Sequence, residues 1–237
     1  MPKLRPQVPL NSLVRSVIVL SRTLDVVKLS KRYRNQEIFS NLSFRVAEGE
    51  VVSLVGPSGS GKTTLLFILA SYDLPSSGSV VFNGLNIAEA NKDQLSDYRF
   101  KVGFVFQESV MLPDLSAMEN VVLPFIPIAK KSQIDRLVAE ANKLSEEFHV
   151  EHIMKRKAAL LSTGEKRRVE FIRAILKKPE VFFADEPTAN LDEESASVII
   201  GVLQELRDQG IPVVFTVHRD QRLSSIASRS VNLLDYK

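Results

Sequence analysis

The sequence predicts an α/β fold in which a largely parallel sheet is covered by helices on both faces. Short apolar segments rich in β-branched residues alternate with segments of helical periodicity over most of the 237 residues. This alternation is typical of strands joined by crossover helices. A glycine-rich stretch stands between one apolar segment and a helix-like run. The composition, 44% hydrophobic and 25% charged, is that of a globular chain with a core.

The first third of the chain is predicted to hold an antiparallel β portion and the start of the parallel sheet. Leu24–Leu29 and Ile38–Val46 are expected to be strands joined by a basic turn at Lys31–Arg34. Val51–Val55 is a short β-branched run suited to a buried strand. A helix is expected from residue 63 to residue 72. Further strands are expected at Ser79–Gly84, where a turn follows, and at Lys101–Gln107.

Residues 108–178 are predicted to form a mainly helical subdomain. Apolar residues there fall on one helical face, and they are Ile134, Leu137, Val138, Ala141 and Leu144. The sheet is expected to resume at Glu180–Asp185 and to continue with residues 212–217 and 231–234. A helix over Glu193–Asp208 is expected between them, and Gly210 is a plausible stop for it.

Composition and charge exclude several classes of site. The chain has no cysteine, which excludes disulfides and thiolate metal sites, and its three histidines lack ligand-like spacing. No apolar run approaches the roughly 20 residues that span a bilayer. Residues 1–35 hold eight Lys or Arg against Asp25 alone, and 1–22 form a basic extension. This extension is read either as a targeting leader or as a loosely docked arm. Nucleic-acid binding is not predicted, because its charges are not interleaved with aromatics.

The glycine-rich stretch GPSGSGKTT fits the phosphate-loop pattern G-x-x-x-x-G-K-[ST] between a strand and a helix. Its backbone N–H groups and the helix N-terminus can bind phosphate oxygens. Lys62 can reach the β- and γ-phosphates, Thr63 can ligate Mg²⁺, and Thr64 can donate to the α-phosphate. A Gly/Ser-rich turn is the alternative. The candidate residues are Gly56, Pro57, Ser58, Gly59, Ser60, Gly61, Lys62, Thr63 and Thr64. The fold class is therefore an α/β P-loop NTPase core.

Polar residues at other strand ends are candidates for catalysis. Asp185 follows an apolar strand, where it can hold Mg²⁺, and Glu186 can orient the water that attacks the γ-phosphate. A solvated acidic turn is the alternative. Gln107 ends another strand, and its amide can contact the metal or the water, although a glutamine in a surface loop is the default interpretation of this residue alone. His218 follows a third strand, where a functional role competes with a structural one.

The stretch LLSTGEKRRVEFIRAIL begins with a capping box, in which Ser162 and Glu165 satisfy each other's backbone N–H groups. Gly164 permits close approach of another group to the backbone. The helix that follows is basic, and a helix N-terminus with exposed N–H groups also binds anions. The stretch is thus both a helix start and a candidate phosphate site.

Taken in order, GPSGSGKTT, GFVFQ, LSTGEKRRV, FFADEPTANLD and TVH resemble the motifs of the ATPase domain of ABC transporters. The resemblance spans nearly the whole chain, and the ABC-type domain is placed at 23–237. The stretches YDLPSSGSV and MLPDLSAMENVVLP are most similar to the branch with lipoprotein-release and macrolide-export ATPases.

This resemblance implies a pair of ATPase subunits stacked head to tail around two ATP and Mg²⁺. It implies that Ser162 and Gly164 face the ATP of the partner subunit and that Tyr33 stacks on adenine. It implies that Asp192 communicates across the dimer, and that Glu186 and His218 form the catalytic pair. It also implies a transmembrane permease as partner and a cytoplasmic location, peripheral on the cytoplasmic face of the membrane.

The sequence departs from the family pattern at four positions. Thr163 and Ala189 stand where the family usually has glycine, and Arg167 stands where it usually has glutamine. Near Glu170 the family usually has a small residue. Two alternatives to a transporter motor stay open. One is a soluble ABC-type ATPase of translation or DNA repair, and the other is a module that dimerises on ATP but scarcely hydrolyses it.

Overall fold

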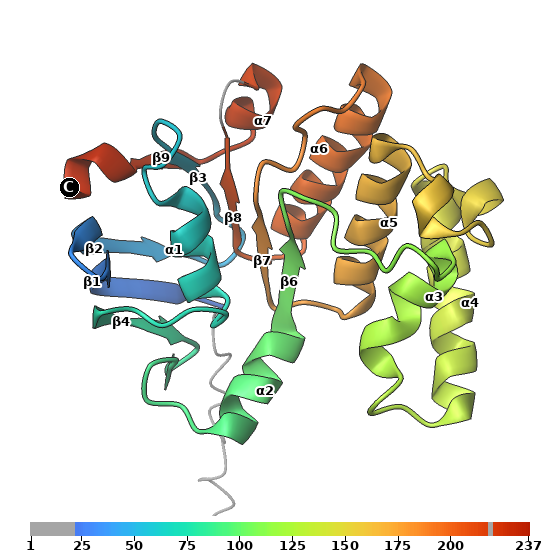
Figure 1. Ribbon diagram of the computed structural model, residues 1–237, viewed down its shortest axis with the longest axis horizontal. Helices are drawn as coiled ribbons and strands as arrows, with labels where there is room; N and C mark the ends of the chain where they lie inside the picture. Colours follow the sequence, from blue (N-terminus) through green and yellow to red (C-terminus); the bar gives the residue numbers. More distant parts are fainter. Residues whose placement is uncertain (1–21, 218–219) are drawn as a thin grey trace, which may run out of the picture.

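In the computed structural model, which describes residues 22–217 and 220–237, two sheets and seven α-helices form three layers (Figure 1). The strands are β1 Leu24–Tyr33, β2 Gln36–Val46, β3 Val51–Val55, β4 Ser77–Phe82, β5 Leu85–Asn86, β6 Val102–Val105, β7 Val181–Ala184, β8 Val213–Thr216 and β9 Arg229–Asn232. The helices are α1 Lys62–Leu69, α2 Lys92–Lys101, α3 Ala117–Val122, α4 Lys131–Glu147, α5 Thr163–Leu176, α6 Glu193–Asp208 and α7 Gln221–Ser225. The basic extension 1–22 lies outside the described residues except for Arg22.

The parallel sheet has the order β6-β7-β8-β3-β9, and the antiparallel sheet has the order β2-β1-β4-β5. The register pairs Val105 with Ala184 and Leu54 with Thr216. The carboxyl ends of β3, β6, β7 and β8 therefore meet at one edge, where the predicted site residues follow the strands. The predicted α/β fold with its N-terminal antiparallel portion is confirmed.

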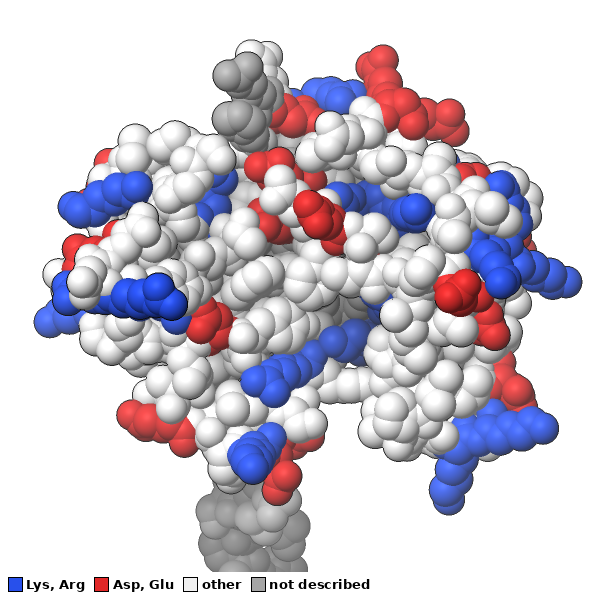
Figure 2. Space-filling model, in the orientation of Figure 1, with Lys and Arg blue, Asp and Glu red and all other residues white. Residues whose placement is uncertain are grey.

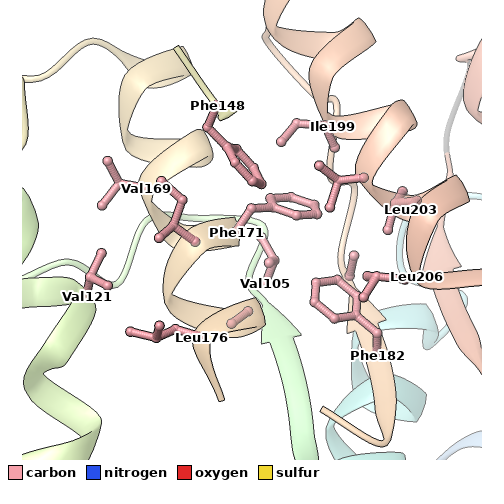
Figure 3. Packing of buried hydrophobic residues seen from close by; sticks show 14 of the residues in the cluster. Val105, Val121, Phe148, Val169, Phe171, Leu176, Phe182, Ile199, Leu203 and Leu206 are labelled. Atoms are coloured by element: carbon pink, nitrogen blue, oxygen red, sulfur yellow. The ribbon is translucent and has the colours of Figure 1, made fainter. Parts of the chain in front are cut away.

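Two apolar cores lie on opposite faces of the parallel sheet. Along β7, Val181 and Phe183 belong to the core shared with α1 and the antiparallel sheet, whereas Phe182 and Ala184 belong to the other. This alternation follows from the period of two in a strand. The second core joins the sheet to α3, α4, α5 and α6 in one continuous cluster, and Figure 3 shows Phe171 of α5 within it.

Two local predictions were wrong. The turn expected at Lys31–Arg34 is strand up to Tyr33, and the chain reverses at Arg34, whose φ is +52°. Lys101 ends α2 rather than starting a strand, and α2 itself was not predicted. The predicted helical segment 108–178 contains α3, α4 and α5, and these helices share a core with the sheet. Within the described part of the chain, none of the helices combines the length and the hydropathy needed to cross a bilayer.

Candidate nucleotide-binding site

The phosphate loop enters α1 through a conformation that requires glycine. Gly61 caps the helix with φ +100°, and a Cβ there would lie 2.5 Å from the Ile38 side chain. Lys62, the first residue of α1, is only 8% exposed. Its Nζ donates to the carbonyl oxygens of Gly56, at 2.8 Å, and Pro57, at 3.1 Å. The loop thus surrounds a cation, and cations bind phosphate.

The loop borders a cavity of about 400 Å³ that also receives side chains from two other strand ends. It is lined by Ile38, Ser58, Gly59, Gly61, Lys62, Thr63, Thr64, Gln107 and Glu186. Ser60 is 1% exposed, and its buried Oγ has no hydrogen-bond partner among residues 22–217 and 220–237. An unpartnered buried hydroxyl is rare unless a ligand or water satisfies it, so the loop fits a polar ligand such as a phosphate.

Asp185 is held by hydroxyl groups on both sides. The Thr63 Oγ1 donates to Asp185 Oδ2 and the Thr216 Oγ1 donates to Asp185 Oδ1, both at 2.6 Å. Thr216 is fully buried at the end of β8, and its hydroxyl also accepts the Glu186 N–H at 2.8 Å. Thr216 was not among the predicted site residues. It stands in the TVH stretch, but threonine is common in strands, and nothing in the sequence shows that its hydroxyl meets Asp185.

Glu186 stands in a left-handed backbone conformation, with φ +45°, directly after Asp185. Such a conformation is uncommon for residues other than glycine and often occurs at functional sites. The Gln107 Nε2 donates to Glu186 Oε2 at 3.2 Å. The structure therefore brings Gln107, Asp185 and Glu186 to the phosphate loop as predicted. His218 lies outside the described residues.

The oxygen groups of Thr63, Asp185 and Gln107 fit Mg²⁺. Among residues 22–217 and 220–237, no group of three or more His, Cys, Asp or Glu could hold a metal ion. Mg²⁺ commonly keeps several waters and binds through one or two carboxylates together with substrate phosphates. A single buried carboxylate between two hydroxyls is consistent with that mode of binding.

Tyr33 is 47% exposed at the end of β1 and is fixed by its neighbours. Its hydroxyl donates to Asp73, which also accepts from Lys31 Nζ at 2.8 Å. This hydrogen bond to Asp73 raises the pKa of Tyr33, while the Thr64 hydroxyl beside it lowers the pKa. The Lys31 Nζ lies 4.4 Å from the ring centroid, so that a base can stack only on the other face.

The predicted capping box at the start of α5 is confirmed. The Ser162 Oγ accepts the Glu165 N–H at 3.2 Å, and Glu165 Oε2 accepts the Ser162 N–H at 2.7 Å. Burial raises the pKa of the Glu165 carboxyl, but the bonds from Ser162 outweigh it and the net shift is downward. Ser162 and Thr163 are exposed. The helix start therefore presents a hydroxyl pair to the surface.

Gly164 is buried against the start of α6. A Cβ at this position would lie 2.8 Å from Ser195 Oγ and 3.4 Å from Asp192 Oδ2. Asp192 caps α6 by accepting the Ser195 N–H at 2.8 Å, and this bond lowers the pKa of Asp192. The close approach predicted at Gly164 is thus made by this chain's own α6. Ser162, Gly164 and Asp192 form a second group, apart from the residues that line the phosphate-loop cavity.

Comparisons with known proteins agree with this geometry. The family model described as "ABC transporter" matches residues 39–189. The chain is 37% identical over 222 residues to the lipoprotein-releasing system ATP-binding protein LolD of Geobacter metallireducens, covering 91% of this chain and 97% of that protein. It is 35% identical to the macrolide export ATP-binding/permease protein MacB of Bdellovibrio bacteriovorus, over 90% of this chain. The chain spans only 33% of the length of that MacB protein.

Solved structures support the same assignment. The dimeric structure of MJ0796, a bacterial ABC transporter cassette, superimposes with a TM-score of 0.79 at 31% identity, covering 88% of this chain and 93% of that one. A dimeric post-hydrolysis state of MJ0796 bound to ADP and Pi gives a TM-score of 0.78 at 30% identity, with the same coverage. The chain therefore belongs to the ABC transporter family.

Proposed function

We propose that the chain is the ATP-hydrolysing motor subunit of a membrane transporter. The observation that carries this proposal is the pairing of Thr63 with Asp185 and of Gln107 with Glu186 at the mouth of one phosphate loop. One acid is positioned to hold a metal and the next to orient water. Phosphoryl transfer depends chiefly on such positioning and on charge neutralisation.

In this mechanism the loop N–H groups and Lys62 bind the phosphates of ATP. Thr63, Asp185 and Gln107 would hold Mg²⁺, which neutralises charge on the phosphates. Glu186 accepts a hydrogen bond from the attacking water and orients it toward the γ-phosphorus. Release of inorganic phosphate from Mg-ATP by the purified chain tests the proposal. A folded chain that binds ATP without hydrolysing it would instead favour the ATP-dependent dimerisation module.

We infer that a second copy of the chain completes the site. Ser162 and Asp192 are exposed helix caps that do not border their own chain's phosphate cavity. A head-to-tail pair would place them against the nucleotide of the partner, as the dimeric state of the MJ0796 structures suggests. The likeness to LolD favours a transporter over a soluble ATPase of translation or DNA repair.

Replacing Ser162 with alanine is expected to slow steady-state ATP hydrolysis by about tenfold or more. The reason is that the variant loses one hydrogen bond to a charged phosphate, which is worth about 1.5–3 kcal/mol. The matched control is Ser116→Ala, because Ser116 caps α3 with the same capping box and its Oγ accepts the Glu119 N–H at the same 3.2 Å. Both variants lose a cap worth about 0.5–2 kcal/mol. Equal hydrolysis by the two variants would make Ser162 only a helix cap.

Replacing Thr163 with glycine is expected not to slow ATP hydrolysis, in contrast to the replacement of Ser162. The exposed β-branched side chain of Thr163 stands where the partner's ATP would approach, so removing its Cβ relieves crowding. For Thr163→Gly we expect unchanged or modestly faster hydrolysis, within about tenfold, or 1.4 kcal/mol of barrier. A much slower folded variant would show instead that the threonine hydroxyl contacts the phosphate.

The transmembrane partner is proposed to dock on the helical side of the molecule. Apolar side chains exposed there are Val110, Leu112, Ile126 and Ile128. Figure 2 shows basic side chains along the hollow between α2 and the α3–α4 region. Exposed apolar residues beside charge are typical of interaction sites. Docking on a permease would place the chain at the cytoplasmic face of the membrane, which the relatives' roles in transport systems support.

Leu112→Asp is expected to release the chain from membranes while leaving basal hydrolysis unchanged. Leu112 is 48% exposed, whereas neighbouring Met111 packs against the core and is a poor probe of this surface. Leu234→Asp is the control, since Leu234 is 49% exposed near the C-terminus. The measurement is the fraction of the chain that sediments with membranes of the producing cells. If Leu112→Asp and Leu234→Asp both sediment with membranes to the same extent as the wild-type chain, the docking surface lies elsewhere.

A further inference from the structure

Helix α5 carries a buried ion pair at two of the positions where the sequence departs from the family pattern. Arg167 and Glu170 lie three residues apart, with 5% and 2% of their side chains exposed, and Arg167 Nη1 is 3.6 Å from Glu170 Oε2. Burying two charges costs free energy unless both are paired and hydrogen-bonded. Replacing such pairs with neutral residues is often harmless to stability, so stability alone gives a weak reason for this pair.

Both side chains bind the main chain that follows β6. The Arg167 Nη1 donates to the carbonyl oxygen of Phe106, and its Nη2 donates to that of Gln107 at 2.6 Å. Glu170 Oε1 accepts the Val110 N–H at 3.0 Å. Three main-chain groups between residues 106 and 110 are therefore held by one helix. A planar guanidinium suits this task, because its donors form a fixed fork.

The segment held in this way carries Gln107, whose side chain contacts Glu186. The same helix is capped by Ser162, the residue proposed to face the ATP of the partner. A continuous path of contacts therefore runs from the start of α5, through Arg167 and Glu170, to the carboxylate proposed to orient water. Helix α5 thus lies between one chain's own nucleotide site and the site it completes on the partner.

We propose that Arg167 and Glu170 are positioning residues that lock the loop 106–110 to α5, so that Gln107 is held at Glu186 when ATP is bound. The inference rests on the proposed ATPase function and extends it to two residues outside the nucleotide site. It assigns to the pair a part in the hydrolytic step rather than in ATP binding. A structural ion pair without this part would affect stability and leave the turnover of the folded chain unchanged.

The test is the double variant Arg167→Gln/Glu170→Gln, which removes both charges of the pair together, although Arg173 then loses Glu170 as its partner. The control is Arg173→Gln, since Arg173 lies on the same helix, 4.0 Å from Glu170. In the part of the chain that the structure describes, the Arg173 side chain forms no hydrogen bond with residues 106–110. We expect kcat of the double variant to fall about ten- to a hundredfold, the scale of a small misplacement of a catalytic group. We expect its KM for ATP to stay close to that of wild type, and both constants of Arg173→Gln to be unchanged.

A second readout is independent of activity. The chain has no tryptophan, so that Ser109→Trp gives a single probe in the exposed part of the loop. We expect lower fluorescence anisotropy of this probe when Ser109→Trp is combined with the double variant than when Ser109→Trp stands alone or is combined with Arg173→Gln. Arg167→Lys retains the charge and can reach one carbonyl rather than two. Its kcat should lie between those of wild type and the double variant, which keeps the test usable if the double variant unfolds.

Wild-type kcat and anisotropy in the folded double variant would overturn the inference, as would equal losses in Arg173→Gln. If the double variant unfolds, wild-type kcat in Arg167→Lys would overturn it. Failure of the proposed function has a different signature. In that case the wild-type chain releases no phosphate from Mg-ATP, or Glu186→Gln hydrolyses ATP as fast as wild type.

Discussion

Replacing Glu186 with glutamine is expected to slow ATP hydrolysis by about 10²–10⁴-fold, the contribution typical of a positioned proton acceptor. Glutamine keeps the shape of the side chain but cannot accept a proton or orient water as a carboxylate does. In the wild-type chain the Gln107 Nε2 donates to Glu186 Oε2 at 3.2 Å. The side-chain amide oxygen of the glutamine in the variant can accept the same hydrogen bond. Steady-state phosphate release measures the loss. Glu205→Gln, an exposed carboxylate on α6, serves as the control and should hydrolyse ATP at the wild-type rate.

The same variant is expected to accumulate as a dimer in Mg-ATP. The chain should be monomeric without nucleotide, because the surface proposed to be shared is polar and centred on phosphate. With hydrolysis stalled, ATP stays between the two copies and holds them together. Light scattering distinguishes the two states. A Glu186→Gln chain that stays monomeric at saturating ATP would contradict the head-to-tail arrangement.

Replacing Lys62 with glutamine is expected to weaken ATP binding by about 10- to 100-fold, as expected for losing a hydrogen bond to a charged group worth about 1.5–3 kcal/mol. The Lys62 ammonium is nearly buried, and its hydrogen-bond partners in the described part of the chain are the neutral carbonyl oxygens of Gly56 and Pro57. An anionic ligand would compensate the burial of this cation better than they do.

Titration with a fluorescent ATP analogue measures the affinity, and thermal unfolding confirms that the variant is folded. The control is Lys143→Gln, which removes an exposed lysine from α4 without touching the loop. Equal affinity of the two variants would show that the loop binds phosphate through its N–H groups alone.

The nucleotide site could be predicted from sequence because its residues follow strands directly. Asp185 and Gln107 stand within two residues of β7 and β6, and parallel pairing brings such ends together whatever the rest of the chain does. Thr216 was missed since its role depends on the neighbouring strand. The turn at Lys31–Arg34 was misplaced, because a basic run has no fixed backbone preference, whereas the register of β1 with β2 extends the strand to Tyr33.

Features that depend on contacts far apart in sequence could not be predicted. Helix α2 buries only Tyr98, so that it has no apolar periodicity to reveal it. The sequence identified Arg167 and Glu170 as unusual, but their partners are about 60 residues away. Gly164 was correctly identified as a point of close approach, and only the folded chain shows that α6 is the element that approaches.

The apolar cluster that joins α3, α4 and α5 to the sheet bears on how the molecule unfolds. Because Phe148 at the end of α4 and Phe182 of β7 belong to the same cluster, neither part keeps its core when the other is lost. We therefore expect that the helical part does not fold on its own when it is excised or grafted onto another cassette. We expect its amides and those of β7 and β8 to exchange as one cooperative unit. We expect any displacement of these helices relative to the sheet to repack this shared core, which favours sliding of packed side chains.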